Sequence, residues 1–252
     1  MKKIILMLFA TFFINTSLLA KEYEVIRFGV DPNYAPFAYK DGTGTLTGFE
    51  VDIGNAICAH LNVRCQWVES DFDGMIPSLN AGKIDAIFAS MTVTDARQKV
   101  IDFSSEVFSS PTAMVFRPGT ELAQGTAVGY LQGSTQEAYA RQVLAPQGMR
   151  IVAYADQEQV YADLVAGRLR ASLQDVQQAK SGFLRTPQGA GFVMGKVIES
   201  ELMPSKSAIG LAKGNQALKA LLDKGLAALH SDGTYARLQE QYFPGVSMFS
   251  GQ

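Results

Sequence analysis

A buried strand that runs directly into a helix start is the feature that most restricts how this chain can fold. Residues 83–89 form an apolar run that follows a turn signal at residues 81–82 and has the length of a buried strand. A helix-start composition follows within a few residues, with Thr94 or Asp95 as the cap. This succession is typical of α/β proteins, in which ligands bind beyond the carboxyl ends of the strands.

The same junction carries groups suited to binding a small anion. Ser90 and Thr92 supply two hydroxyls, and Arg97 adds a guanidinium that can hold two oxygens at once. The free N–H groups and the dipole of a helix start favour negative charge at the same place. We therefore interpret residues 89–97 as a carboxylate receptor. A plain capped helix with a solvated arginine would explain this stretch alone equally well.

Two other strand ends carry side chains suited to a ligand. Residues 23–30 alternate as a strand does, and they run into a proline-fixed loop that presents Asp31 and Tyr34. A second strand, predicted over residues 63–68, leads to Phe72 just before another helix. Strands and helices therefore alternate through the first part of the chain, and candidate ligand-binding residues lie where strands end.

A second unit of the same kind follows. A strand predicted over residues 125–130 leads to a helix start at Ser134 and Thr135, whose hydroxyls and free N–H groups form a second candidate anion site. An ordinary Ser/Thr cap is the alternative interpretation.

The chain also contains a faint internal repeat. Residues 79–86 and 164–171 match in spacing, which two lobes of related design would explain. The second copy runs into Asp175, a carboxylate at a strand end that could equally cap the next helix. A helix is predicted over residues 215–229, and a last one begins near residue 233.

Composition describes an exported globular protein. A chain of 252 residues with 47% apolar and 18% charged residues can bury a core. Residues 1–20 join a basic end to an apolar run and small residues, which predicts a cleaved signal peptide, with a retained membrane anchor as the alternative. Removal of this segment leaves 20 basic and 24 acidic residues, a formal charge of −4 that argues against a nucleic-acid surface.

The two cysteines, Cys58 and Cys65, enclose six residues, and in an exported protein such a pair favours a disulfide over a metal site. Two buried free thiols are the alternative. His60 and His230 have no ligand-like neighbours in the sequence, so we assign them neither a metal nor a catalytic role. No phosphate-binding glycine loop and no HExxH motif occurs in the chain, and we expect no cofactor.

Several motifs together resemble a known family. They are DPNYAPF at residues 31–37, GFEVD at 48–52, SDFDGMIPSL at 70–79, TVTDARQ at 92–98, LQGSTQEAYA at 131–140, AGRL at 166–169, QD at 174–175 and DGTY at 232–235. The set spans nearly the whole chain after its N-terminal segment. It resembles the periplasmic polar amino-acid binding proteins of ABC importers, and most of all the lysine/arginine/ornithine-binding and histidine-binding proteins.

The resemblance implies a periplasmic binding protein fold of type II, in which two α/β lobes joined by two hinge strands close on one amino acid. Residues 21–109 and 207–252 would form lobe 1, and residues 110–206 would form lobe 2 with the hinge crossings. It implies a periplasmic monomer whose partners are a free amino acid and an inner-membrane permease with its ATPase. The spacing of Cys58 and Cys65 matches the family's disulfide.

The resemblance also assigns roles at the backbone end of the ligand. Arg97 would hold the α-carboxylate with the help of Ser90, Thr92 and the Thr135 helix terminus. Asp175 and the Ser90 carbonyl would bind the α-ammonium group. This agrees with the charges inferred from the residues alone.

The remaining family positions would surround the ligand side chain. Asp31 would pair with a cationic tip, and the rings of Tyr34 and Phe72 would enclose the stem, since aromatic faces attract cations. Ala89 stands where basic amino-acid binders have a serine that helps with the tip, so the preference among lysine, arginine, ornithine and histidine stays open. The wall would be completed by Leu131, Ser134 and Gln136.

The sequence therefore predicts a receptor for a basic L-amino acid and not an enzyme. One rival is an enzyme similar to the cyclohexadienyl dehydratases on the same fold, with Asp175 or Glu50 as the acid. Asp31 argues against it by repelling the two carboxylates of prephenate. A second rival is a receptor for larger arginine conjugates such as opines.

Overall fold

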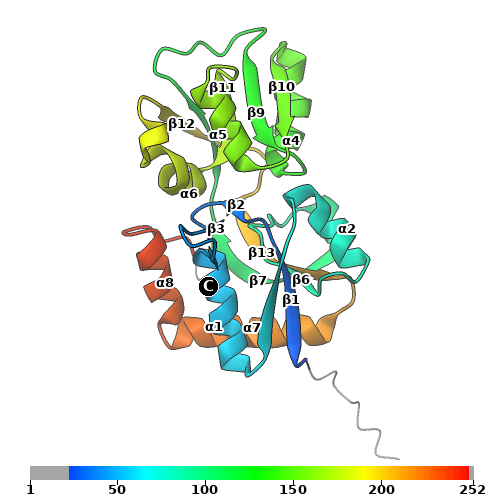
Figure 1. The fold of residues 1–252 in the computed structure, drawn as a ribbon. Coiled ribbons are helices and arrows are strands. Elements are labelled where there is room, and N and C mark those ends of the chain that lie inside the picture. Colours follow the sequence, from blue (N-terminus) through cyan, green and yellow to red (C-terminus); the bar gives the residue numbers. More distant parts are fainter. Residues whose placement is uncertain (1–22, 250–252) are drawn as a thin grey trace, which may run out of the picture.

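The computed structural model describes residues 23–249, and the predicted signal peptide lies outside them. These residues form two α/β lobes, placed one above the other in Figure 1, which confirms the predicted fold class. Each lobe is built around one five-stranded sheet. Within residues 23–249, no helix has both the length and the apolar character needed to span a membrane.

Lobe 1 contains the sheet whose strand order is β5 (Arg64–Glu69), β1 (Val25–Val30), β6 (Ala86–Ile87), β13 (Lys206–Ala212) and β7 (Ile101–Ser109). β1 is parallel to both β5 and β6, whereas β13 is antiparallel to its neighbours β6 and β7. The N-terminal half and the C-terminal part of the chain therefore share one sheet.

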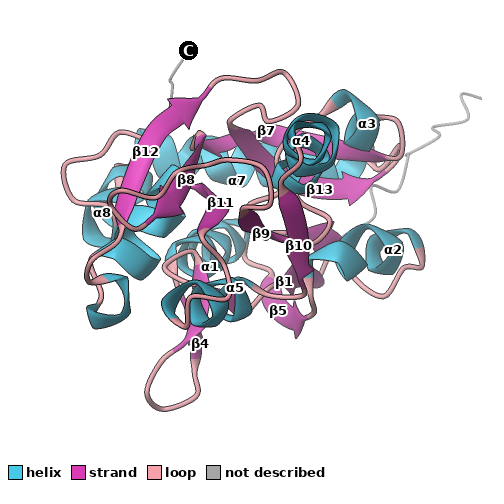
Figure 2. Cartoon of the chain, turned by 90° about the horizontal axis from the view of Figure 1, so that it is seen from above, coloured by secondary structure: helices cyan, strands magenta, loops and turns pink. Residues whose placement is uncertain are grey.

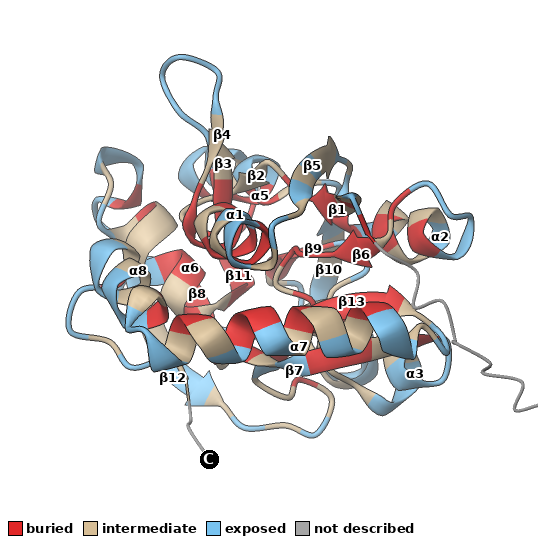
Figure 3. Ribbon diagram, turned by 90° about the horizontal axis from the view of Figure 1, so that it is seen from below, coloured by how far each residue is buried: buried red, intermediate tan, exposed pale blue. Residues whose placement is uncertain are grey.

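Helices cover this sheet on both faces. One face packs against α1 (Phe49–Leu61), α7 (Gln216–Ser231) and α8 (Thr234–Tyr242), and the other packs against α2 (Met75–Asn80). Figure 3 shows α7 lying along β7 and β13. Leu218, Leu222 and Leu229, whose spacing predicted this helix, are buried there.

Lobe 2 contains the sheet whose strand order is β10 (Arg150–Tyr154), β9 (Ala127–Leu131), β11 (Ala171–Asp175), β8 (Thr112–Phe116) and β12 (Val193–Ile198). Its helices are α4 (Thr135–Tyr139), α5 (Gln157–Val165) and α6 (Val176–Gln178). Two π-helical segments, Ala140–Leu144 and Ala179–Leu184, extend α4 and α6. Short 3-10 turns cover Ala145–Gln147 and Pro187–Gly189.

A small third sheet is formed by β2 (Asn33–Tyr34), β3 (Ala38–Lys40) and β4 (Leu46–Thr47). It belongs to the segment between β1 and α1, and its β3–β4 turn projects from the molecule in Figure 2 and Figure 3. The Phe72–Gly74 3-10 turn leads into α2, and the short helix α3 (Asp95–Gln98) precedes β7.

The chain crosses between the lobes twice. It passes from β7 to β8 through Ser110 and Pro111, and it returns from β12 to β13 through residues 199–205. The crossings are tied together, because Ser110 N–H donates to Ser205 O at 2.9 Å and the Ser109 and Ser205 hydroxyls lie 2.8 Å apart. The exact limits assigned to each lobe from the resemblance stay a prediction.

The internal repeat corresponds to the same local structure in both lobes. α2 and α5 each end in a glycine of positive φ, Gly82 at 68° and Gly167 at 75°, a conformation that glycine adopts without strain. The turn leads into β6 in lobe 1 and into β11 in lobe 2. β6 is parallel to β1, and β11 is parallel to β9. The predicted likeness of the two units is therefore confirmed.

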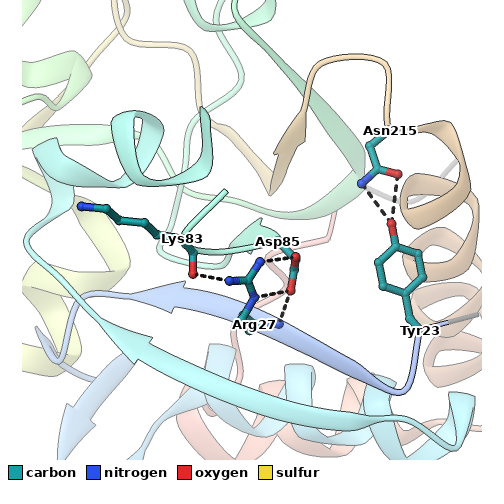
Figure 4. A network of polar contacts seen from close by, with 5 residues as sticks. All are labelled: Tyr23, Arg27, Lys83, Asp85 and Asn215. Atoms are coloured by element: carbon teal, nitrogen blue, oxygen red, sulfur yellow. Dashed lines mark hydrogen bonds and ion pairs between the residues drawn. The ribbon is translucent and has the colours of Figure 1, made fainter. Parts of the chain in front are cut away.

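An ion pair holds the turn before β6 against β1 (Figure 4). Two nitrogens of the Arg27 guanidinium bind the two carboxylate oxygens of Asp85 at 2.8 and 2.9 Å, and a third nitrogen donates to Lys83 O at 2.9 Å. In the same view, the Tyr23 hydroxyl and the Asn215 side chain are hydrogen-bonded at the start of α7. These contacts fix the position of β6, whose end carries the predicted carboxylate receptor.

The predicted disulfide is confirmed, since Cys58 and Cys65 are bonded to one another. The bond joins the end of α1 to the start of β5. Two predicted elements are shorter than expected: β6 contains only Ala86–Ile87, and the helix after Thr94 contains only Asp95–Gln98. The chain leaves the sheet early because residues 88–94 bend toward the site described next.

Candidate functional site

A cavity lined by residues of both lobes lies where the two lobes meet. Every residue predicted from the sequence to contact a ligand lines this cavity. They are Asp31, Tyr34, Phe72, Ala89, Ser90, Thr92 and Arg97 of lobe 1, and Leu131, Ser134, Thr135, Gln136 and Asp175 of lobe 2. The structure thus brings the predicted set together, while the role of each residue stays a prediction.

Arg97 is the only positively charged residue among those that line the cavity. Thr94 caps its helix by accepting from Arg97 N–H at 3.2 Å. The guanidinium donates to Thr92 O at 2.8 Å and to Gly133 O of lobe 2 at 3.0 Å, and it lies 5.4 Å from the centre of the Phe72 ring. These contacts hold the guanidinium in place. Because both acceptors are uncharged backbone carbonyls, they do not neutralise its positive charge.

The charge of Arg97 has no carboxylate partner within residues 23–249, because no ion pair there includes it. Burial lowers the pKa of the guanidinium to about 10, which still leaves it protonated near neutral pH. A buried cation of this kind is costly unless an anion joins it. An anion that entered the cavity would therefore be stabilised beside Arg97.

The second predicted anion site is partly an ordinary helix cap. The Ser134 hydroxyl accepts from Glu137 N–H at 3.3 Å and donates to Leu131 O, so it serves the start of α4. Thr135 is buried and faces the cavity beside Gln136, whose amide donates to Thr112 Oγ1 at 3.0 Å. The helix start thus presents Thr135 to a ligand, while the Ser134 hydroxyl is already used.

Three carboxyl groups line the cavity together with Arg97, two of which were predicted. Asp175 caps α6, and its Oδ1 accepts from the Ser110 hydroxyl at 2.7 Å and from two backbone N–H groups at 2.9 Å. Asp31 accepts from Asn33 N–H at 3.0 Å, but its Oδ2 has no partner within the described residues. Burial raises the pKa of both carboxyls to about 6.

The third carboxyl, Glu50, was not predicted as a ligand-binding residue. It lies in the first turn of α1, and its Oε1 accepts from Ser90 N–H at 2.6 Å. This bond supports Ser90 in a left-handed conformation, φ 51°, which is uncommon for a residue other than glycine. Burial raises the pKa of Glu50 to about 8. The contact joins residues forty positions apart, and no pattern in the sequence indicates it.

Six further residues that were not predicted also line the cavity: Ser110, Thr112, Gln157, Leu173, Gln174 and Pro204. Five of them had a usable signal, because they lie at the lobe crossings or precede Asp175 on the same strand. Thr112 begins β8, just after the first crossing. Gln157 had no such signal, since it is the first residue of α5 and lies in neither position.

Direct hydrogen bonds also join the lobes beside the cavity. The Gln132 amide donates to Asp73 at 2.6 Å, and the Gln178 amide donates to Ala35 O at 3.1 Å. Together with the Arg97 contact to Gly133, they connect lobe 1 to lobe 2 at three places. The lobes therefore stand in a closed arrangement around the cavity.

Two α/β lobes that close on a buried, charged cavity define the class of solute-binding proteins. The chain belongs to family 3 of the bacterial extracellular solute-binding proteins, which it matches over residues 26–245. This confirms the resemblance inferred from the motifs.

The chain is 42% identical to the lysine/arginine/ornithine-binding periplasmic protein of Escherichia coli (strain K12), over 96% of this chain and 97% of that protein. It is 38% identical to the histidine-binding periplasmic protein of the same strain, with the same coverage. An ancestral arginine-binding protein bound to arginine has a similar structure, with a TM-score of 0.81, 30% identity, and coverage of 87% of this chain and 98% of that one. All three are binding proteins by name.

Proposed function

We propose that this chain captures a basic L-amino acid in the periplasm and delivers it to the permease of an ABC importer. The observation that carries the proposal is the charge of the cavity. With the Glu50 pKa raised to about 8, Arg97, Asp31 and Asp175 leave a net charge of −1 near neutral pH. A basic amino acid carries one carboxylate and two positive groups, so its net charge of +1 complements that cavity.

The roles of the residues follow from this match. Arg97 binds the α-carboxylate with Ser90, Thr92 and Thr135, and Asp175 binds the α-ammonium group. The unpaired Oδ2 of Asp31 then receives the cationic tip of the side chain. The rings of Tyr34 and Phe72 line the path between these two ends.

Capture is coupled to closure because the proposed ligand touches both lobes. Arg97 and Asp31 belong to lobe 1, while Thr135 and Asp175 belong to lobe 2. Only a ligand that binds the closed state more tightly than the open one shifts the lobes toward closure. The closed monomer then presents both lobes to the permease and its ATPase, and this chain carries out no chemical step on the ligand.

The dehydratase alternative fits the cavity less well. Prephenate carries two carboxylates, whereas the cavity offers one guanidinium and three carboxyl groups. The opine alternative adds a second carboxylate on the α-nitrogen, which would lie near the carboxyl of Asp175 and is disfavoured there. Neither has an observation of its own in its favour.

Isothermal titration of refolded, ligand-stripped protein without residues 1–20 tests the proposal. The ligands are arginine, lysine, ornithine, histidine and neutral glutamine, and the variant is Asp31→Asn. We expect one-to-one binding of a cationic amino acid, weakened about 10- to 100-fold by the variant, since a buried hydrogen bond to a charged group is lost.

The outcomes separate the alternatives. Glutamine as the best ligand, with no effect of Asp31→Asn, would mean that the backbone clamp is right and the side-chain assignment is wrong. Binding of octopine in preference to arginine would favour the opine receptor. Turnover of prephenate or arogenate, without binding of any amino acid, would replace the receptor by an enzyme.

A further inference from the structure

Gln157 is a buried amide at the cavity to which the proposed function gives no role. It is the first residue of α5 and shares the buried face of that helix with Val160, Tyr161 and Leu164. Its side chain is 2% exposed and lines the cavity, and its Nε2 has no hydrogen-bond partner within the described residues. A buried amide without a hydrogen-bond partner is unfavourable, so we expect a polar group within the cavity to pair with the Gln157 amide.

The other unpaired group of this kind at the side-chain end of the cavity is Asp31 Oδ2, in the opposite lobe. α5 contacts β2, which begins two residues after Asp31. Glu158, the neighbour of Gln157, lines one hollow together with Pro32 and Asn33, the neighbours of Asp31. The start of α5 in lobe 2 therefore faces the loop that carries Asp31 in lobe 1.

A structural role for Gln157 within lobe 2 is the competing explanation. Burial raises the pKa of the Tyr161 hydroxyl, and the nearby Gln157 amide offsets part of that rise. The Tyr161 hydroxyl donates toward the amide oxygens of Gln174 and Gln178, and its oxygen retains lone pairs that could accept from Gln157 Nε2. No hydrogen bond is formed between Gln157 and Tyr161, however, so the Gln157 amide stays unpaired within lobe 2.

Resting on the proposed function, we propose that Gln157 binds the tip of the ligand side chain from lobe 2 while Asp31 binds it from lobe 1. A half-turn of the amide presents its oxygen in place of its nitrogen, so Gln157 can accept from a donor-only cation. The Asp31–Gln157 pair favours a guanidinium over a primary ammonium. A guanidinium spreads five N–H donors over a rigid plane and reaches two walls at once, whereas an ammonium gathers its donors on one atom.

Titrations of three variants test this inference against arginine, ornithine and norleucine, which has no polar tip. Gln157→Met keeps the length of the side chain and removes the amide. Gln157→Glu keeps an acceptor. Gln159→Met is the matched control, because Gln159 lies two residues further along α5, is exposed and does not line the cavity.

We expect Gln157→Met to weaken arginine binding about 10- to 100-fold, ornithine binding by a smaller factor and norleucine binding hardly at all. Gln157→Glu should retain most of the arginine affinity at about pH 8, and Gln159→Met should match the unmodified protein. Norleucine binding also reports whether each variant is folded.

Equal losses for arginine and norleucine would assign Gln157 a structural role and overturn the inference. Unchanged arginine binding by Gln157→Met would also overturn it, while leaving the basic amino-acid receptor intact. If the unmodified protein bound no cationic amino acid, the proposed function itself would fail and this inference with it.

Discussion

The two walls of the cavity recognise by different means. Lobe 1 contributes Arg97, Asp31 and Glu50, so three of the four carboxyl or guanidinium groups that line the cavity come from one side. Lobe 2 contributes Asp175 and otherwise presents hydroxyl, amide and apolar groups. The difference suggests a division of labour in which lobe 1 sets the charge of the ligand and lobe 2 completes its hydrogen bonds on closure.

The most direct test of this difference between the lobes is to remove the charge of Arg97 in lobe 1. We expect Arg97→Met to weaken binding of the preferred amino acid at least about 1,000-fold, because a buried ligand carboxylate would lose its only cationic partner. The matched change in lobe 2, Thr135→Val, should cost only about 10-fold. Titration calorimetry of both variants measures the ratio, and comparable losses would refute the division between the lobes.

The second test concerns closure and touches no ligand contact. A Cβ on Gly182 of lobe 2 would lie 2.2 Å from Ala35 O of lobe 1, too close for the closed arrangement. Gly182→Ala should therefore weaken binding on the order of 100-fold by depleting the closed state. The free energy of unfolding of the Gly182→Ala variant without ligand should not fall, since alanine is favourable in a helical segment.

Gly42→Ala is the control for this closure test, because a Cβ there meets nothing within 4 Å. Small-angle scattering with saturating ligand should show Gly182→Ala more extended than the control. A Gly182→Ala protein that closed normally around its ligand would contradict the contact between these two lobes.

The smallest expected effect is a dependence on pH that separates Asp31 in lobe 1 from Asp175 in lobe 2. Burial raises the pKa of both from 3.8 to about 6, so the folded protein binds more protons than the unfolded chain. The free energy of unfolding without ligand should therefore decrease as the pH rises from about 4 to about 6. A cationic ligand favours the ionised carboxyls and should release protons on binding.

The affinity for a cationic ligand should rise as these carboxyls ionise. Each carboxyl that binds the ligand should contribute a factor of about ten between about pH 5 and about pH 7. Norleucine uses Asp175 alone, so its affinity should rise about tenfold, and that of arginine by the product of the two factors. Titrations in buffers of different ionisation enthalpy count the released protons. A flat profile for both ligands would mean that neither carboxyl meets a positive group.

Local patterns predicted the parts of the site that depend on position along the chain. Asp31 and Asp175 lie at strand ends, and Arg97 lies in the capped helix that follows β6. The Thr94 cap and the two strand junctions confirmed the turn and cap signals around them. The motifs also identified the family, and with it the two-lobed fold. These features are readable because each is encoded within about ten consecutive residues.

The parts that were not predicted depend on contacts between distant segments. Glu50 reaches Ser90 across forty positions, and the start of α5 lies near the loop of Asp31 only because the two lobes meet. The predicted strand before Ala89 proved shorter because this contact holds Ser90 in a bend that periodicity does not reveal. No single segment contains the information for such through-space contacts.

The internal repeat has a consequence for the direction in which a ligand lies. The repeated unit leads to the helix of Arg97 in lobe 1 and to Asp175 in lobe 2, so units of related structure lead to opposite charges at one cavity. A zwitterion placed between them behaves as an electric dipole and is attracted in one orientation only. On the proposed function, the two charges therefore fix the orientation of the bound ligand, with its side chain turned toward Asp31.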